Sequence, residues 1–134
     1  MRSIAPGLRT YLDAHASTGG SPVCLHHAPQ DAGEKYFVIE RLNLDNNATM
    51  DDPGDDSLIS ETVRVTAYGR TDLIAHTAAD AVRDAIEDYT GAMGTDRVCV
   101  ALYVESESGD YDPPTFVDGY AVSDLTLLIH HKPA

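Results

Sequence analysis

The second half of the chain joins one long amphipathic segment to two strongly alternating segments, and this order limits the folds open to it. Apolar residues recur at helical spacing over 71–89, whereas apolar and polar residues alternate over 97–105 and 120–130. The first pattern predicts a helix of about 19 residues, roughly 28 Å long. The other two patterns predict half-buried strands. A helix packed on a mostly antiparallel sheet accommodates all three elements.

The first half predicts a shorter helix and further strands. Apolar residues fall on one face of a helix over 4–15, for which Ser3 is the predicted N-cap. The segment 35–43 is apolar on both faces, which indicates a strand buried on two sides. Another strand is expected over 60–68, and the segment 23–27 could form a short strand.

We therefore expect an α+β fold: a mostly antiparallel four-stranded sheet packed by the long helix and by the shorter N-terminal helix. The segment 45–57 is acidic and nearly free of apolar residues, so it should form a long projecting β-hairpin loop. A length of 134 residues is typical of one domain, and we assign 1–134 to a single domain.

Charge and cysteine content narrow the classes of function. With 22 acidic and 9 basic residues the formal charge is −13, which argues against a protein that grips nucleic acid through its phosphates. Such an acidic surface favours solubility, and it is also common in high-salt hosts. Cys24 and Cys99 are predicted to be structural thiols in a reducing compartment. No segment has the length of a membrane span, and the N-terminus lacks the apolar stretch of a secretory signal.

Two acidic segments contain the candidate site residues. Asp45 could begin a calcium loop, but Met50 stands where that loop needs glycine and Asp56 where it needs glutamate. A weaker divalent-cation site within 51–56 stays open as an alternative. Carboxylates in the turn 105–114 lack an apolar pocket that would separate their pKa values for hydrolysis. We expect no catalytic residue, cofactor or metal centre. The candidate channel or interface residues are Asp45, Asp51, Asp52, Asp55, Asp56, Glu105, Glu107, Asp110, Tyr111 and Asp112.

Two pairs of adjacent histidines invite a metal-binding interpretation. They are His26-His27 and His130-His131. Neighbouring residues on a strand point to opposite faces of the sheet, so neither pair can chelate one ion in that geometry. We therefore do not expect either pair to form a metal site.

Three phrases of the sequence resemble the tail completion proteins of long-tailed bacteriophages, the tail terminator group. The phrases are HHAPQDAGEKYFVIERL, SETVRVTAYGRTDLIAHTAADAVRDAI and VCVALYVESESGDYDPPTFVDGYAVSDLTLLIHH. The resemblance covers residues 8–131 and consists of patterns of residue type. The chain departs from the commoner family pattern in the length and acidity of its 45–57 loop.

The resemblance implies a structural virion protein and no enzyme. Such proteins form a ring, usually a hexamer, on the head-proximal end of the tail tube, where they stop tube polymerisation and face the head. The implied partners are further copies of the chain, the tail tube protein and the head–tail connector or stopper protein. Assembly would take place in the host cytoplasm. Ring neighbours could cover apolar side chains beyond the needs of one small core, namely Tyr36, Phe37, Tyr103 and Leu128.

The acidity suggests a role in the channel of such a ring. Six copies would carry a formal charge of −78, six times −13, although salt would screen most of it. Genomic DNA would then pass through without specific binding, because duplex DNA is itself densely negative. We expect part of the 45–57 loop or of the 105–112 turn to face the channel or its rim. The alternative is that these carboxylates face outward and solubilise the ring. An alternative class of function is a small acidic module that binds divalent cations or a peptide.

Overall fold

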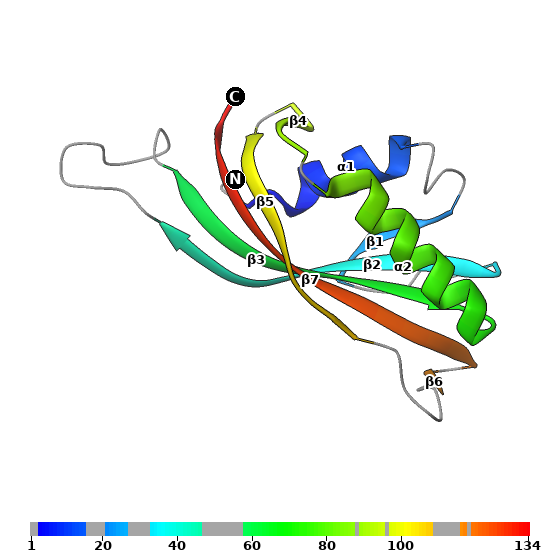
Figure 1. The fold of residues 1–134 in the computed structure, drawn as a ribbon. Helices are drawn as coiled ribbons and strands as arrows, with labels where there is room; N and C mark the ends of the chain where they lie inside the picture. Colours follow the sequence, from blue (N-terminus) through cyan, green and yellow to red (C-terminus); the bar gives the residue numbers. More distant parts are fainter. Residues whose placement is uncertain are drawn as a thin grey trace.

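A computed structural model of the chain describes residues 3–15, 21–26, 33–46, 58–87, 89–95, 97–108, 116–117 and 119–134. Strands dominate these residues, and two helices accompany them (Figure 1). In chain order the elements are α1 (Ala5–Ala14), β1 (Val23–Leu25), β2 (Lys35–Asn46), β3 (Ile59–Gly69), α2 (Asp72–Ile86), β4 (Gly91–Met93), β5 (Arg97–Ser108), β6 (Phe116–Val117) and β7 (Tyr120–Pro133).

All seven strands belong to one strongly curved sheet (Figure 1). The strand order is β1-β2-β3-β7-β5-β4, and β6 pairs with β7 beside this path. The strand β1 runs parallel to β2, whereas all other neighbours are antiparallel. The expected four-stranded antiparallel sheet packed by a long helix is therefore wrong. The four long strands do pair with one another, but short strands extend the sheet at both sides and make it mixed.

The helix α2 is shorter than its apolar pattern predicts. It has 15 residues, a length of about 22 Å, and ends at Ile86 instead of Tyr89. Its start is as expected, because the Thr71 hydroxyl accepts a hydrogen bond from the Ile74 N–H at 3.2 Å. At the other end Glu87 leaves the helical conformation with ψ 127°. Beyond the helix, Gly91 has φ +133° and begins β4.

The helix α1 confirms the predicted apolar face but not the predicted cap. Ile4, Leu8 and Leu12 are fully buried. The N-cap position belongs to Ile4, without a side-chain cap bond. The Ser3 hydroxyl instead accepts a hydrogen bond from the Ala5 N–H at 3.1 Å and donates its own proton to a glutamate of β3.

One face of the sheet holds the main core, because both helices pack on it. Alanines on α2, such as Ala78 and Ala79, are buried and let this helix lie close to β3 and β7. The prediction that β2 is buried on both faces is confirmed: Phe37 and Ile39 face the main core. On the other face, Tyr36 and Val38 form a second, smaller core together with Tyr120.

Candidate functional site

The described part of the chain contains three of the ten predicted site residues. Asp45 lies in β2, where its backbone pairs with Ser60. Glu105 and Glu107 lie in β5. The other seven predicted residues fall outside the described residues: Asp51, Asp52, Asp55, Asp56, Asp110, Tyr111 and Asp112.

Two of the expected loop boundaries are wrong. The strand β2 continues to Asn46, so Asp45 belongs to a strand and not to the loop over 45–57. The strand β5 continues to Ser108, so Glu105 and Glu107 belong to a strand and not to a turn. Cross-strand pairing explains why both strands are longer than predicted. Glu107 pairs with Leu125 of β7, and Asp45 pairs with Ser60 of β3.

The two strand glutamates differ in their surroundings. The Glu107 carboxylate accepts a hydrogen bond from the Arg83 guanidinium of α2 at 2.5 Å, and Arg83 also lies 3.6 Å from Glu87. Glu105 is exposed and makes no ion pair with another described residue. The predicted acidic cluster is therefore divided: one carboxylate is neutralised by α2, and its neighbour remains a free negative charge at the surface of β5.

Two long strand edges, on opposite sides of the sheet, have no partner among the described strands. At one side, β4 pairs with β5 only over 97–99, and no described strand pairs with the outer edge of β5 over 100–108. At the other side, β1 pairs with β2 only over 37–39, and no described strand pairs with the outer edge of β2 over 40–46. Open edges of this length expose rows of backbone N–H and C=O groups that can pair with another chain.

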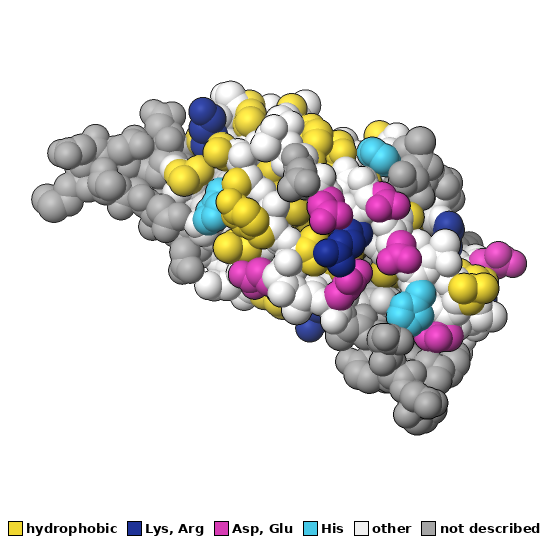
Figure 2. Space-filling view, viewed as in Figure 1, with side chains coloured by type: hydrophobic (Ala, Val, Ile, Leu, Met, Phe, Trp, Pro, Cys, Tyr) yellow, Lys and Arg dark blue, Asp and Glu magenta, His cyan; other side chains and the backbone are white. Residues whose placement is uncertain are grey.

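Exposed apolar side chains concentrate at these two edges. Leu42 on β2 is 47% exposed, and Val100 and Tyr103 on β5 are 43% and 55% exposed. Figure 2 shows hydrophobic side chains gathered over β5 beside a histidine. Two further exposed large hydrophobic residues, Leu58 and Leu73, lie elsewhere. Apolar side chains beside unpaired strands are typical of surfaces that bind another protein.

The face of the sheet opposite the helices, here called the outer face, is covered by no described helix. Its central part is polar: the Arg64 guanidinium lies 2.9 Å from the Glu40 carboxylate across β2 and β3. Nearer β5, the rings of Tyr103 and His130 meet edge to face at 5.9 Å. Around Tyr103 the outer face is exposed and continues the apolar edge of β5, whereas Tyr36, Val38 and Tyr120 on the same face are buried.

A buried polar network that we did not predict lies under this sheet. Glu61 of β3, Arg97 of β5 and His131 of β7 are at most 4% exposed. The Arg97 Nε–H donates to His131 Nδ1 at 3.0 Å, and His131 Nε2 lies 2.9 Å from the Glu61 carboxylate. The same carboxylate accepts the Ser3 hydroxyl at 2.6 Å and the Ile4 N–H at 2.7 Å.

The network fixes the protonation of its members. Burial alone would raise the pKa of Glu61, but hydrogen bonds from His131, Ser3 and the Ile4 backbone outweigh it, so the pKa lies below its usual value. A guanidinium can only donate, so the Nδ1 atom of His131 must accept from Arg97 and the proton must sit on Nε2.

The position of this network indicates a structural role. It ties the residues before α1 to three neighbouring strands, and all its side chains are buried. The sequence contains a signal for it, because Glu61 falls in phase with the inward-facing Val63 and Val65, and His131 falls in phase with Leu127 and Ile129. A carboxylate in the apolar phase of a strand needs a buried partner.

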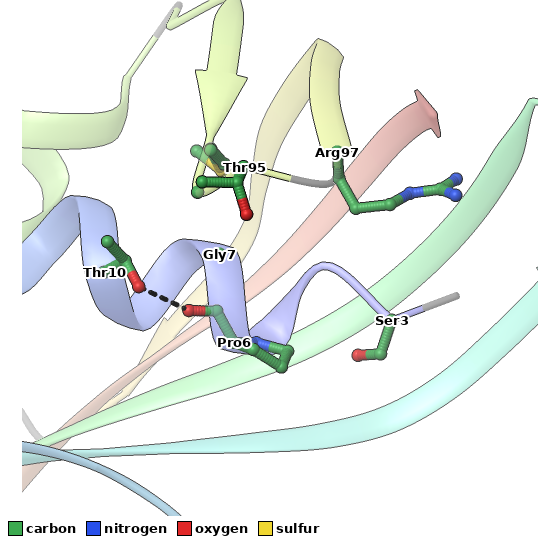
Figure 3. A pocket seen from close by; sticks show the side chains of 8 residues that line it. Ser3, Pro6, Gly7, Thr10, Thr95 and Arg97 are labelled. Carbon is green, nitrogen blue, oxygen red and sulfur yellow. Dashed lines mark hydrogen bonds between the residues drawn. The ribbon is translucent and has the colours of Figure 1, made fainter. Parts of the chain in front are cut away.

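A small cavity lies beside the network, between α1 and the turn that joins β4 to β5 (Figure 3). Its volume is about 130 Å³, which is below the range of about 300–1,000 Å³ typical of ligand sites. Figure 3 shows the Arg97 side chain extending away from Thr10, whose hydroxyl donates to the Pro6 carbonyl at 3.1 Å. The cavity is therefore a packing feature in which few polar groups converge.

The remaining reactive side chains are dispersed. His131 points into the core and His130 lies on the outer face, as expected for neighbours on a strand. Cys24 and Cys99 are free thiols, and burial raises the pKa of Cys99 to about 11. Within the described ranges, no three His, Cys, Asp or Glu side chains are placed to hold a metal ion. Neither described helix has the length and apolar character that a membrane span requires.

No protein-family model matches the chain, and no curated protein matches it either. The sequence phrases and the geometry of the sheet are the features of the chain that bear on its function.

Proposed function

We propose that the chain is a structural virion protein that forms a ring on the head-proximal end of a phage tail tube. There it would end tube polymerisation and join the tail to the connector or stopper protein of the head. The three sequence phrases support this role. The geometric observation that carries the proposal is the pair of open strand edges on opposite sides of one curved sheet.

The open edges favour a closed assembly of identical subunits. The two edges are different surfaces, so a contact between them is heterologous, and such contacts close into rings when the rotation between neighbours allows it. The exposed Leu42, Val100 and Tyr103 would be removed from water in this contact. Tyr36 and Phe37, which we expected ring neighbours to cover, are already buried within a single chain.

The outer face is suited to layers of other proteins above or below the ring. Tyr103 is exposed on this face and the Arg64–Glu40 pair is partly exposed, so the face combines charged and aromatic side chains. Polar surfaces with a few aromatic anchors are typical of interfaces between separately folded proteins. Tail tube and connector subunits are the partners that this role requires. The net charge of −13 fits a channel through which DNA passes without sticking.

A second candidate is a small peptide-binding module. The open edge of β5 favours it, because an extended peptide can add to such an edge as a further strand. This candidate predicts a monomer with a vacant edge, whereas the ring predicts that the edge is occupied by a neighbouring copy. The oligomeric mass in solution separates the two.

The tail role is tested by adding the purified chain to polymerising tail tube protein of the same phage and imaging the tubes by electron microscopy. The proposal predicts a ring at one end of each tube and an end to growth at amounts of the chain far below those of the tube protein. Tubes of unchanged length with bare ends would contradict it. Bovine serum albumin at the same concentration is the control for crowding.

A further inference from the structure

We propose that neighbouring copies join by a continuous strand ladder: the β5 edge over 100–108 of one copy pairs antiparallel with the β2 edge over 40–46 of the next. This inference rests on the proposed ring, and it names the surfaces that form it. It does not depend on where the ring sits in a virion.

Strand directions determine the orientation of this ladder. The neighbours β2 and β3, β3 and β7, and β7 and β5 are all antiparallel. Three reversals make β2 and β5 run in opposite directions. A second copy placed beside the first in the same orientation therefore presents its β2 antiparallel to β5. Antiparallel pairing is the more stable arrangement per residue.

The backbone of β2 directs hydrogen-bonding groups toward the edge at which this pairing would form. Its outward-facing groups bond to the β1 segment: the Phe37 N–H donates to the Pro22 carbonyl at 2.9 Å, and the Ile39 carbonyl accepts from the His26 N–H at 3.0 Å. The chain then turns away at His26, which has φ +62°. Every second residue of a strand directs its backbone N–H and C=O to the same edge, so the exposed Arg41 follows Phe37 and Ile39 in facing outward. No described strand forms hydrogen bonds with these Arg41 groups.

Charge favours the contact between unlike edges. Arg41 is exposed on β2, Glu105 is exposed on β5, and neither makes an ion pair with another described residue. The register that places Arg41 opposite Glu105 also places Asn43 opposite Tyr103 and Leu42 opposite Val104. A contact between two β5 edges would set glutamates against glutamates, and a contact between two β2 edges would set arginine against arginine. Like charges opposite each other destabilise a ladder.

Charge reversal tests the pairing. We expect Arg41→Glu and Glu105→Arg each to weaken self-association about tenfold, measured by sedimentation velocity over a dilution series. The double variant, with both reversals, should recover most of the wild-type association. Asp84→Arg, an exposed reversal on α2, is the matched control and should associate like the wild type. Single reversals without effect, in a chain that still forms a ring, would overturn the ladder and leave the proposed function standing.

Cross-linking gives an independent result that does not depend on a loss of association. In a Cys24→Ser, Cys99→Ala background, the variants Asn43→Cys and Tyr103→Cys, which lie opposite each other in this register, should form disulfide-linked dimers only when mixed. Each variant alone should stay uncross-linked, since the two positions lie on different edges. Cross-linking of the Tyr103→Cys variant with itself would overturn the ladder in favour of a symmetric contact. A wild-type chain that stays monomeric at all concentrations would overturn both the ladder and the ring.

Discussion

The Nε2 atom of His131 lies 2.9 Å from the Glu61 carboxylate, and both side chains are completely buried. The contact crosses from β7 to β3 and continues through Ser3 and Ile4 to the start of α1. It therefore joins the N-terminal segment to the centre of the sheet by charged hydrogen bonds as well as by apolar packing.

Removing the Glu61 charge should destabilise the fold strongly. The variant Glu61→Gln removes the charged acceptor that Ser3, Ile4 and His131 share in the buried network, and we expect the free energy of unfolding to fall by about 2–4 kcal/mol. Urea denaturation followed by circular dichroism measures this loss. The control is Glu40→Gln, which removes a partly exposed partner of Arg64 and should cost less than about 1 kcal/mol. Equal losses in the two variants would contradict a structural role for the network.

The Glu61 carboxylate should make the free energy of unfolding depend on pH. The pKa of Glu61 is lower in the folded chain than in the unfolded chain. The ionised carboxylate therefore contributes its full share of the free energy of unfolding above the unfolded pKa of about 4.3. This share is lost as the pH falls through the folded pKa. The difference in unfolding free energy between wild type and Glu61→Gln should thus be constant from about pH 5 to 7 and shrink below about pH 4. A difference that grows on acidification would show that the pKa is raised.

The packing of α1 against β4 should require a glycine at position 7. A Cβ atom added at Gly7 would lie 2.2 Å from the Met93 carbonyl oxygen, whereas one added at Gly33 would meet nothing within 4 Å. We expect Gly7→Ala to lower the free energy of unfolding by about 1–3 kcal/mol through overpacking. Gly33→Ala should be neutral or slightly stabilising, because it restricts the unfolded chain. Thermal denaturation of the two variants side by side tests this difference.

The buried thiol should be unreactive in the native protein. With a pKa of about 11, about one Cys99 thiol in a thousand is ionised at pH 8, and its side chain is 1% exposed. In a Cys24→Ser variant, iodoacetamide should leave Cys99 unmodified in buffer and alkylate it in concentrated urea, as read by mass spectrometry. Rapid alkylation in buffer would mean that this side of the core opens readily.

Much of the fold could be predicted from periodicity. The four long strands and the apolar faces of both helices follow from alternation at two and 3.6 residues, as with Val63 and Val65 on β3 or Leu8 and Leu12 on α1. A strand over 23–27 is predicted, and β1 occupies Val23–Leu25, but its parallel pairing with β2 leaves no local signal. The strands β4 and β6 have only three and two residues, too few to show a period. They are held by neighbours distant in sequence. Without them the sheet was mistaken for a four-stranded one.

The candidate site could be predicted less well. The acidic pattern of 105–112 identified Glu105 and Glu107 as surface residues but missed the pairing of Glu107 with Arg83, which comes from a different element. The network around Glu61 was missed although its phase in β3 signals it. Which edges remain open depends on strand order, and strand order arises from contacts between distant segments that no local pattern encodes.

Native mass spectrometry of the purified chain over a range of concentrations tests the central claim most directly. The account predicts one dominant closed ring, and for a hexamer a mass of six times 14.4 kDa, about 86 kDa. A chain that stays at 14.4 kDa at every concentration, or that forms only a dimer, would contradict it.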